Sequence, residues 1–266
     1  MNILTPSLTA AAPGALLVWV ALVAAFTLLW AASLPLENAS IVDMWWGPAF
    51  VLAAAVYATA HGALGPRAVV VMTVVALWAL RLAWHIGRRN IGHGEDPRYV
   101  VWRTQYGASW WWFSWIKVFF LQATVAWVVS WPLGAALNGM PDFPTLFDIL
   151  GLGLALAGLA CEAIADEQLR RFKRTAARDQ ICDVGLWRYS RHPNYFGESV
   201  VWWGLFVVAA GVPGGWMTIV SPAIMTWLLL RVSGVTLLEQ GLTSSKPGYA
   251  EYVRRTSAFV PRPPRV

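Results

Sequence analysis

Seven apolar stretches, each about long enough to cross a bilayer as a helix, dominate the sequence. They run approximately over residues 15–34, 43–61, 67–87, 114–137, 145–165, 194–211 and 215–237. A helix pairs its backbone N–H and C=O groups internally, which lipid requires of any spanning segment. The stretches also lack the residue-by-residue alternation of apolar and polar side chains that is typical of the strands of an outer-membrane barrel. The sequence therefore predicts an all-α integral membrane protein with seven transmembrane helices in a single domain over residues 1–266.

Composition supports a bilayer environment. The chain is 58% hydrophobic and only 13% charged, and it carries 18 tryptophans. Indole rings favour the headgroup zone, and several tryptophans lie beside the ends of the apolar stretches, such as Trp45, Trp111 and Trp131. Residues 1–14 contain no Lys or Arg, so we expect the first stretch to be a retained span rather than a cleaved signal. Cys161 and Cys182 are expected to be free thiols.

Basic residues are strongly segregated along the chain. Sixteen of the 20 Lys and Arg residues fall in three segments, 88–113, 166–193 and 238–266. Cytoplasmic loops carry such an excess in membrane proteins. With seven spans, this predicts an outside N-terminus and a cytoplasmic C-terminus.

A cationic stripe is predicted at the end of the third apolar stretch. Arg81, His85 and Arg88 are spaced i, i+4, i+7, so they share one face of a helix. Guanidinium groups bind phosphate oxygens in bidentate geometry, which makes the stripe a candidate phosphate site. The alternative is that these side chains reach for anionic headgroups.

A second polar stripe leaves the fifth apolar stretch. Asp166, Arg170 and Lys173 share one helical face, and Glu162 lies one turn earlier within apolar sequence. The stripe could clamp a phosphate and a ribose, or it could be ordinary ion pairing along a helix.

The third candidate is residues 185–198, GLWRYSRHPNYFGE. Pro193 suits the first turn of a helix, so the sixth span is expected to begin there. Asn194 and Glu198 then lie one turn apart on one face, and Asn194, His192 and Arg191 offer partners for the Glu198 carboxylate. The helix dipole at this end favours a phosphate.

Two further candidates lie near the ends of the chain. The tail carries Glu239, Tyr249 and Tyr252, and by itself it would also fit an amphipathic segment on the membrane surface. Asp43 opens the second span, where it could be a helix cap or a buried proton donor.

Familiar soluble-enzyme motifs are absent from the sequence. It contains no P-loop, no GxGxxG, no His and Cys spacing typical of a metal site, and no serine elbow. Any ligand site must therefore be built by the membrane helices themselves, and neither a metal nor a nucleic acid is expected.

These motifs resemble a known family. The 185–198 segment, the preceding ADEQLRRFK and the Tyr…Tyr…Pro tail are similar to the membrane steroid 5α-reductases and, more closely, to their bacterial relatives of the DUF1295 group. The resemblance covers about residues 40–266 and is best over 160–262. The sterol reductases share the 191–195 core, and these families use NADPH. The isoprenylcysteine carboxyl methyltransferases share the Arg-His-Pro turn and the tail but use S-adenosylmethionine.

The resemblance implies NADPH held inside the helical bundle on its cytoplasmic side. The residues that would contact it are Arg81, His85, Arg88, Glu162, Asp166, Arg170, Lys173, Tyr189, His192, Asn194, Glu198, Glu239, Tyr249 and Tyr252.

The implied reaction is reduction of a flat apolar enone, such as a 3-oxo-Δ4-steroid that enters from the bilayer. Hydride would reach the β-carbon while an acid polarises the ketone. Asp43, Glu198 and Trp78 are the implied catalytic residues, with Asp43 near the place of a family glutamate and Trp78 at that of a family tyrosine. We expect a monomer in a bacterial inner membrane. The alternatives are an S-adenosylmethionine-dependent methyltransferase and a sterol or lipid binder without enzymatic activity.

Overall fold

The computed structural model describes residues 5–62, 65–137, 142–177, 179–232 and 234–265. Within these residues every regular element is helical, and the only strand-like pairing is one isolated bridge between Ser190 and Ser257. The predicted all-α class is confirmed. Packing divides the chain into two compact units, residues 1–148 with 208–218, and residues 149–207 with 219–266.

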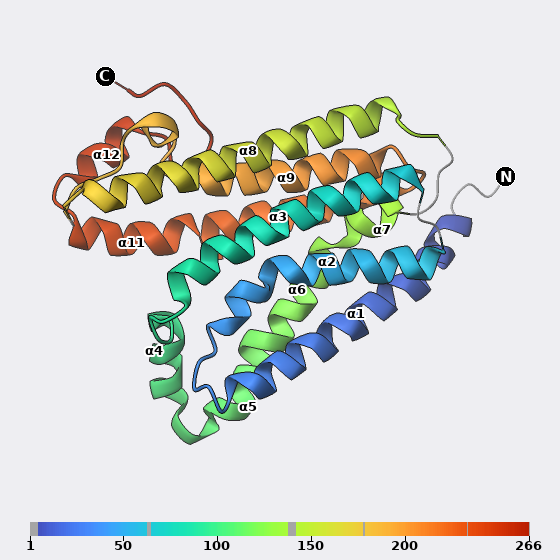
Figure 1. Ribbon diagram of the computed structural model, residues 1–266, viewed down its shortest axis with the longest axis horizontal. Coiled ribbons are helices and arrows are strands. Elements are labelled where there is room, and N and C mark those ends of the chain that lie inside the picture. Colours follow the sequence, from blue (N-terminus) through green and yellow to red (C-terminus); the bar gives the residue numbers. More distant parts are fainter. Residues whose placement is uncertain (1–4, 63–64, 138–141, 178, 233, 266) are drawn as a thin grey trace. The chain divides into compact units, whose positions relative to one another are not determined.

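The first unit contains most of the N-terminal helices (Figure 1). Its elements are α1 (Thr5–Ser33), α2 (Ile41–His61), α3 (Pro66–Asn90), α4 (Pro97–Tyr106), η1 (Gly107–Ser109), α5 (Trp110–Ser114), the π-helical turn η2 (Trp115–Phe120), α6 (Leu121–Val129), α7 (Trp131–Leu137) and nearly all of η4 (Gly215–Ile219).

The second unit contains the candidate motifs of the C-terminal half. Its elements are α8 (Leu146–Thr175), η3 (Gly185–Arg188), α9 (Pro193–Ala210), α10 (Val220–Trp227), the π-helical turn η5 (Leu228–Val232), α11 (Val235–Ser245) and α12 (Tyr249–Arg255). The first three residues of α8 and the last three of α9 belong to the first unit.

Six helical segments among the described residues are long and apolar enough to cross a membrane. They are Gly14–Ser33, Ile41–His61, Pro66–Asn90, Pro97–Leu137, Leu146–Thr175 and Gly215–Val232. Each contains or largely overlaps a predicted span, so the chain is an integral membrane protein. The remaining prediction, 194–211, corresponds to α9, which is a helix of 18 residues. It is not among the six, because its first turns carry Asn194 and Glu198.

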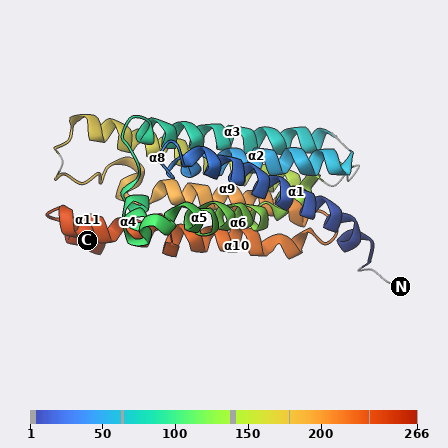
Figure 2. The same ribbon diagram turned by 90° about the horizontal axis from the view of Figure 1, so that it is seen from below.

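Close backbone contacts hold α2 at the centre of the first unit, beside α1 and α3 (Figures 1 and 2). A Cβ atom added to Gly47 would lie 2.8 Å from the Ala79 carbonyl oxygen on α3. A Cβ added to Gly134 would lie equally close, 2.8 Å, to the ring of Tyr57. Only glycine permits such close approaches. In lipid no hydrophobic effect drives helices together, so close packing of this kind stabilises their association instead.

Local signals explain several helix ends. Asp96 caps α4, because its carboxylate accepts a hydrogen bond from the Arg98 N–H, and Pro97 takes the first helical position. The sequence had placed residues 88–113 in a cytoplasmic segment, whereas the structure forms helices from Pro97 onward that continue into the next span. Arg178, one of the predicted cytoplasmic basic residues, lies outside the described residues.

Candidate functional site

A close crossing of α8 and α9 organises the second unit, where the two ribbons run side by side (Figure 1). A Cβ atom on Gly158 would lie 2.6 Å from the Gly197 carbonyl oxygen, and one on Gly204 would lie 2.6 Å from the Gly151 carbonyl oxygen. The two backbones are therefore in direct contact, as small residues permit in membrane helix pairs. Side chains beside these glycines are held firmly between the helices.

Three of the predicted acidic residues are buried at this crossing. Glu162, Asp166 and Glu198 are only 1%, 9% and 7% exposed. The Glu162 side chain packs on the backbone of Gly197, where an added Cβ would lie 2.8 Å from Glu162 Cγ. Buried carboxyl groups are costly unless they are hydrogen-bonded or neutral. A concentration of them in one helix pair is therefore typical of a functional site rather than of simple packing.

The start of α9 is tied to α8 by a side-chain hydrogen bond. Asn194 Nδ2 donates to Asp166 Oδ1 over 3.1 Å. Asn194 lies in the first turn of α9, immediately after Pro193, so the Asp166 carboxylate is held at a helix N-terminus, where the dipole favours negative charge. The pairing brings two predicted cofactor residues from different motifs together.

Arg191 and Glu239 form a partly buried ion pair in the second unit. Arg191 Nε and Nη2 donate to the two Glu239 carboxylate oxygens over 2.7 and 3.1 Å. His192 Nε2 lies 3.1 Å from Glu239 Oε1, so this ring nitrogen carries the proton that it donates. Burial alone would raise the pKa of the Glu239 carboxyl, but the His192 and Arg191 hydrogen bonds outweigh it and hold that pKa at about 2.

The tail packs on the turn that precedes α9. Arg191 Nη1 also donates to the carbonyl oxygens of Val253 and Thr256. Ser190 Oγ donates to the Phe259 carbonyl oxygen over 2.7 Å, and the Tyr252 hydroxyl donates to the Trp187 carbonyl oxygen. The tail is thus part of the site and not a free amphipathic segment.

Both tail tyrosines predicted to bind cofactor are buried, Tyr249 at 3% and Tyr252 at 4% exposure. Burial, with the Glu239 carboxylate as the second cause, raises the pKa of Tyr249 to about 12. Burial also raises the pKa of Tyr252. Both phenols therefore stay protonated at neutral pH and can only donate or accept hydrogen bonds.

Arg170, Lys173 and Tyr189 lie farther out, at the surface. Arg170 pairs with Glu167 over 2.5–2.6 Å and not with Asp166, which is turned inward to Asn194. Lys173 and Tyr189 are exposed. The predicted stripe is therefore divided: its acid joins the buried cluster, and its bases lie nearer the surface at the end of α8.

In the first unit, Asp43 is the centre of a separate polar cluster. Its Oδ1 accepts a hydrogen bond from the Tyr99 hydroxyl over 2.7 Å, and its Oδ2 accepts one from Arg98 Nη2 over 2.9 Å. Ser40, not Asp43, occupies the N-cap position of α2. The carboxylate is engaged by side chains from α4, as expected of a positioned acid.

The neighbouring loop reinforces this cluster. Glu95 accepts from the Ala39 N–H over 2.7 Å and pairs with Arg103 over 2.8 Å. Asp96 pairs with Arg98 over 2.9 Å. Burial opposes ionisation of Asp96, but the hydrogen bonds from Arg98 prevail and hold the pKa of this carboxyl below its usual value. Arg98 is therefore fixed between Asp43 and Asp96.

The predicted α3 residues occupy different environments. Trp78 is 1% exposed and packs edge-on against Phe50 at 5.6 Å between ring centroids. Arg81 and His85 are half-buried, whereas Arg88 is exposed and lies over the Trp84 ring. Arg81, His85 and Arg88 therefore do lie along one helix, α3, at the predicted spacing. Arg88, at the outer end of this stripe, makes a cation–π contact with Trp84.

Sequence reasoning missed Arg98 and Tyr99. They follow Asp96 and Pro97, a helix-start signal inside the segment that had been assigned to a loop. Recognition of that cap would have placed both side chains on the first turn of a helix, although not against Asp43.

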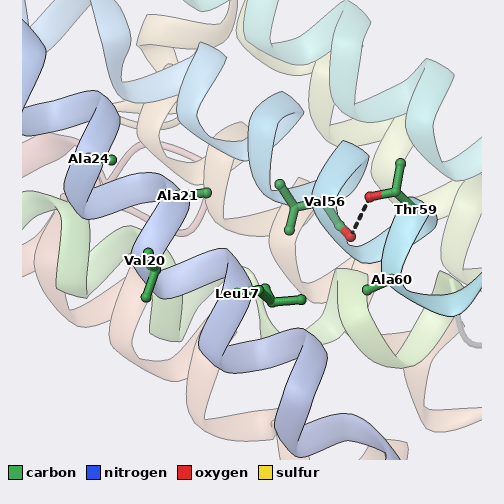
Figure 3. A pocket seen from close by; sticks show the side chains of 7 residues that line it. All are labelled: Leu17, Val20, Ala21, Ala24, Val56, Thr59 and Ala60. Carbon is green, nitrogen blue, oxygen red and sulfur yellow. Dashed lines mark hydrogen bonds between the residues drawn. The ribbon is translucent and has the colours of Figure 1, made fainter.

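An apolar groove lies between α1 and α2 of the first unit (Figure 3). The groove has a volume of about 500 Å³ and is lined by Leu17, Val20, Ala21, Ala24, Val56, Thr59 and Ala60. The Thr59 hydroxyl donates to the Val56 carbonyl oxygen over 2.9 Å, so the lining offers little to a polar ligand. No group of three or more metal-ligating side chains occurs within the described residues.

Fold and site together define an all-α integral membrane protein with buried acidic clusters between its helices. The family model for DUF1295, described as a protein of unknown function, matches residues 29–256. The chain belongs to the DUF1295 family.

Comparison with a curated relative and with solved structures does not identify a function. An uncharacterized protein of the fission yeast Schizosaccharomyces pombe is 24% identical over 270 aligned positions, which cover 88% of this chain and 76% of the relative. No solved structure matches the chain.

Proposed function

We propose that the protein is an NADPH-dependent membrane reductase that saturates the C=C bond of a lipophilic enone, with a 3-oxo-Δ4-steroid as the model substrate. The observation that carries this proposal is the Asp43–Tyr99 pair. Reduction of an enone requires a donor at the ketone oxygen. A buried phenol beside a carboxylate can become that donor when its single hydrogen turns from the carboxylate to the ketone. A methyltransferase has no need of one.

In this proposal Tyr99 replaces Trp78 as the ketone-polarising residue. The Tyr99 hydroxyl donates its single hydrogen to Asp43 over 2.7 Å, and Arg98 donates to the second Asp43 oxygen. When substrate binds, the Tyr99 hydrogen would turn to the ketone oxygen, while Arg98 keeps Asp43 in place. A phenol can donate a hydrogen bond to a ketone and pass on a proton, whereas an indole N–H cannot supply the proton. Asp43 positions the phenol, and Trp78 packs against Phe50 between α2 and α3.

The second unit supplies groups that fit a nicotinamide nucleotide. Asp166, Asn194 and Glu198 can accept from or donate to ribose hydroxyls and a carboxamide, and the start of α9 favours a phosphate. The half-buried Arg170 and the exposed Lys173 suit the 2′-phosphate. NADPH would supply the hydride. Arg191 and Glu239 would hold the turn that carries His192 and Asn194.

The membrane topology proposed with this function has seven spans. Besides the six long apolar segments, α9 would cross the bilayer with its polar first turns at the cytoplasmic surface, its acids being satisfied within the protein. The C-terminus would lie in the cytoplasm, and a bacterial inner membrane is the proposed location. The apolar groove of Figure 3 suits a substrate or lipid chain that arrives from the bilayer.

The deciding experiment compares nucleotides on the purified protein in detergent. We expect NADPH to bind more tightly than NADH, and S-adenosylmethionine not to bind. Single-turnover oxidation of bound NADPH should require an added enone. Tight binding of S-adenosylmethionine would contradict the proposal and indicate a methyltransferase. Binding of a sterol without NADPH or S-adenosylmethionine would indicate a lipid-binding protein without enzymatic activity.

A further inference from the structure

A small polar cavity in the first unit lies where α2 begins and α3 ends. It has a volume of about 150 Å³ and is lined by Asn38, Ser40, Ile41, Met44, Asn90, Ile91, Gly92 and Gly94. Gly92 and Gly94 have φ values of +82° and +79°, which let the backbone curve around it. The volume is several times the roughly 30 Å³ that one water occupies.

A buried donor on the cavity wall lacks an acceptor. Asn90 Nδ2 is buried, and nothing in the part of the chain that the structure describes accepts its hydrogen bond. The amide orientation is determined by Arg89, whose Nε donates to Asn90 Oδ1 over 3.0 Å. A flipped amide would place two donors against each other. Buried donors are almost always satisfied, so the missing acceptor belongs to a cavity occupant.

Ser40 adds a second donor on the same wall. Its Oγ accepts from the Asp96 N–H over 2.6 Å, which leaves the hydroxyl hydrogen to point elsewhere. Asn38 Oδ1 is already used, since it accepts from the Ser40 N–H over 2.9 Å. The cavity therefore presents donors to an occupant, beside the N-terminus of a 21-residue helix.

Most of the surrounding carboxylates are neutralised by arginines. Glu95 is paired with Arg103, and Asp43 and Asp96 are paired with Arg98, whereas Glu37, next to Asn38, is exposed to solvent. The Arg89 side chain is exposed next to Asn90. We propose that this cavity is a binding site for a phosphate oxyanion, in which Asn90 and Ser40 donate to the phosphate oxygens. The site shares no residue with the nucleotide-binding residues of the proposed function and does not depend on it.

Phosphate could come from a phospholipid headgroup or from a soluble ion, and the experiment separates the two. The thermal unfolding midpoint of the full chain in phosphate-free detergent would be titrated with inorganic phosphate, and separately with dihexanoyl phosphatidylglycerol. We expect both to stabilise the wild-type protein. A midpoint concentration at least ten-fold lower for the lipid identifies a headgroup site, and the reverse order identifies a soluble ion.

Substitutions of Asn90 test whether its side chain donates to the bound phosphate. Asn90→Asp, which keeps the shape but replaces the donor with a carboxylate, should weaken the stabilisation about ten-fold or more, and Asn90→Leu should act similarly. Gln105→Leu removes an exposed amide nearby on α4 and should change nothing. If neither ligand stabilises the wild-type protein, or if the Asn90 variants respond as the wild type does, the cavity contains only water and the proposal is wrong.

Discussion

At the scale of single residues, substitutions in the Asp43–Tyr99 pair should slow the reduction step without weakening nucleotide binding. Tyr99→Phe removes the phenolic donor with little change of volume, and Asp43→Asn removes the charge that orients it. Each should slow reduction of a 3-oxo-Δ4-steroid by about 10²-fold or more, the usual scale for loss of a positioned acid.

The measurement pairs single-turnover NADPH oxidation with nucleotide affinity. Neither variant should change the affinity for NADPH appreciably. By contrast, Glu198→Gln should impair affinity and turnover together. A Tyr99→Phe protein that reduces the steroid at the wild-type rate would show that the pair has only a structural role.

Glu239 predicts a pH dependence of stability. Its pKa in the folded protein is about 2, below the usual 4.5, so its pairing stabilises the fold fully above pH 4.5. That contribution is lost as the pH falls from about 4.5 toward 2. Glu239→Gln should lower stability by about 1.5–3 kcal/mol at pH 7, the range for hydrogen bonds to charged groups.

Thermal unfolding of both proteins in detergent between pH 7 and pH 3 provides the test. The difference between wild type and Glu239→Gln should narrow steadily below pH 4.5. A constant difference down to pH 3 would show that the Glu239 carboxylate is not the titrating partner of Arg191 and His192.

Residue types and spacing identified the polar clusters but not all of their partners. The family resemblance implied one site for Asp166, Asn194 and Glu198, and the structure buries the two acids and half-buries Asn194. Spacing on a helix, however, allows Arg170 to reach either Asp166 or Glu167, and only the fold shows that Asp166 is turned inward. Tyr99 is 56 residues from Asp43, a separation at which no local pattern predicts contact.

At the scale of elements, the α8–α9 crossing predicts unequal effects of two glycine substitutions on one helix. Gly158→Ala places a Cβ 2.6 Å from the Gly197 carbonyl oxygen and should destabilise by about 1–3 kcal/mol through overpacking. Gly153→Ala, on the same helix, meets nothing within 4 Å and should be neutral or slightly stabilising.

Thermal midpoints of the two alanine variants decide this prediction, with NADPH affinity as a second measurement. Separation of the helices at Gly158 should also disturb Glu162, so nucleotide affinity should fall in that variant alone. Equal midpoints for the two variants would contradict the close crossing.

The lengths of the apolar stretches predicted which helices exist. The residues at which helices begin and end depend instead on short capping sequences. The second and third spans were expected at 43–61 and 67–87, close to the observed Ile41–His61 and Pro66–Asn90. Residues 97–113 were misread as a loop, because charged and aromatic residues alternate there without a long apolar run. In the structure the Asp96 cap starts α4, and its pairing with Arg98 holds the first turn.

At the scale of the whole molecule, the number of spans depends on α9. If α9 crosses the bilayer, residues that precede and follow it lie on opposite sides. Reporter fusions after Ala177 and after Pro213 test this directly. We expect a fluorescent reporter to be active only after Ala177, and alkaline phosphatase only after Pro213. The same reporter active at both positions would mean that α9 does not span.

The contact between residues 253–262 and the turn before α9 has a consequence for biogenesis. A ribosome synthesises these residues after those of every apolar helix described above. Arg191 must therefore remain without its Val253 and Thr256 partners until that later segment has been made and has left the ribosome. Chains released early, or degraded from the C-terminal side, would keep their membrane helices and still lack an ordered turn for His192 and Asn194. Quality control that senses this turn would distinguish finished molecules from unfinished ones.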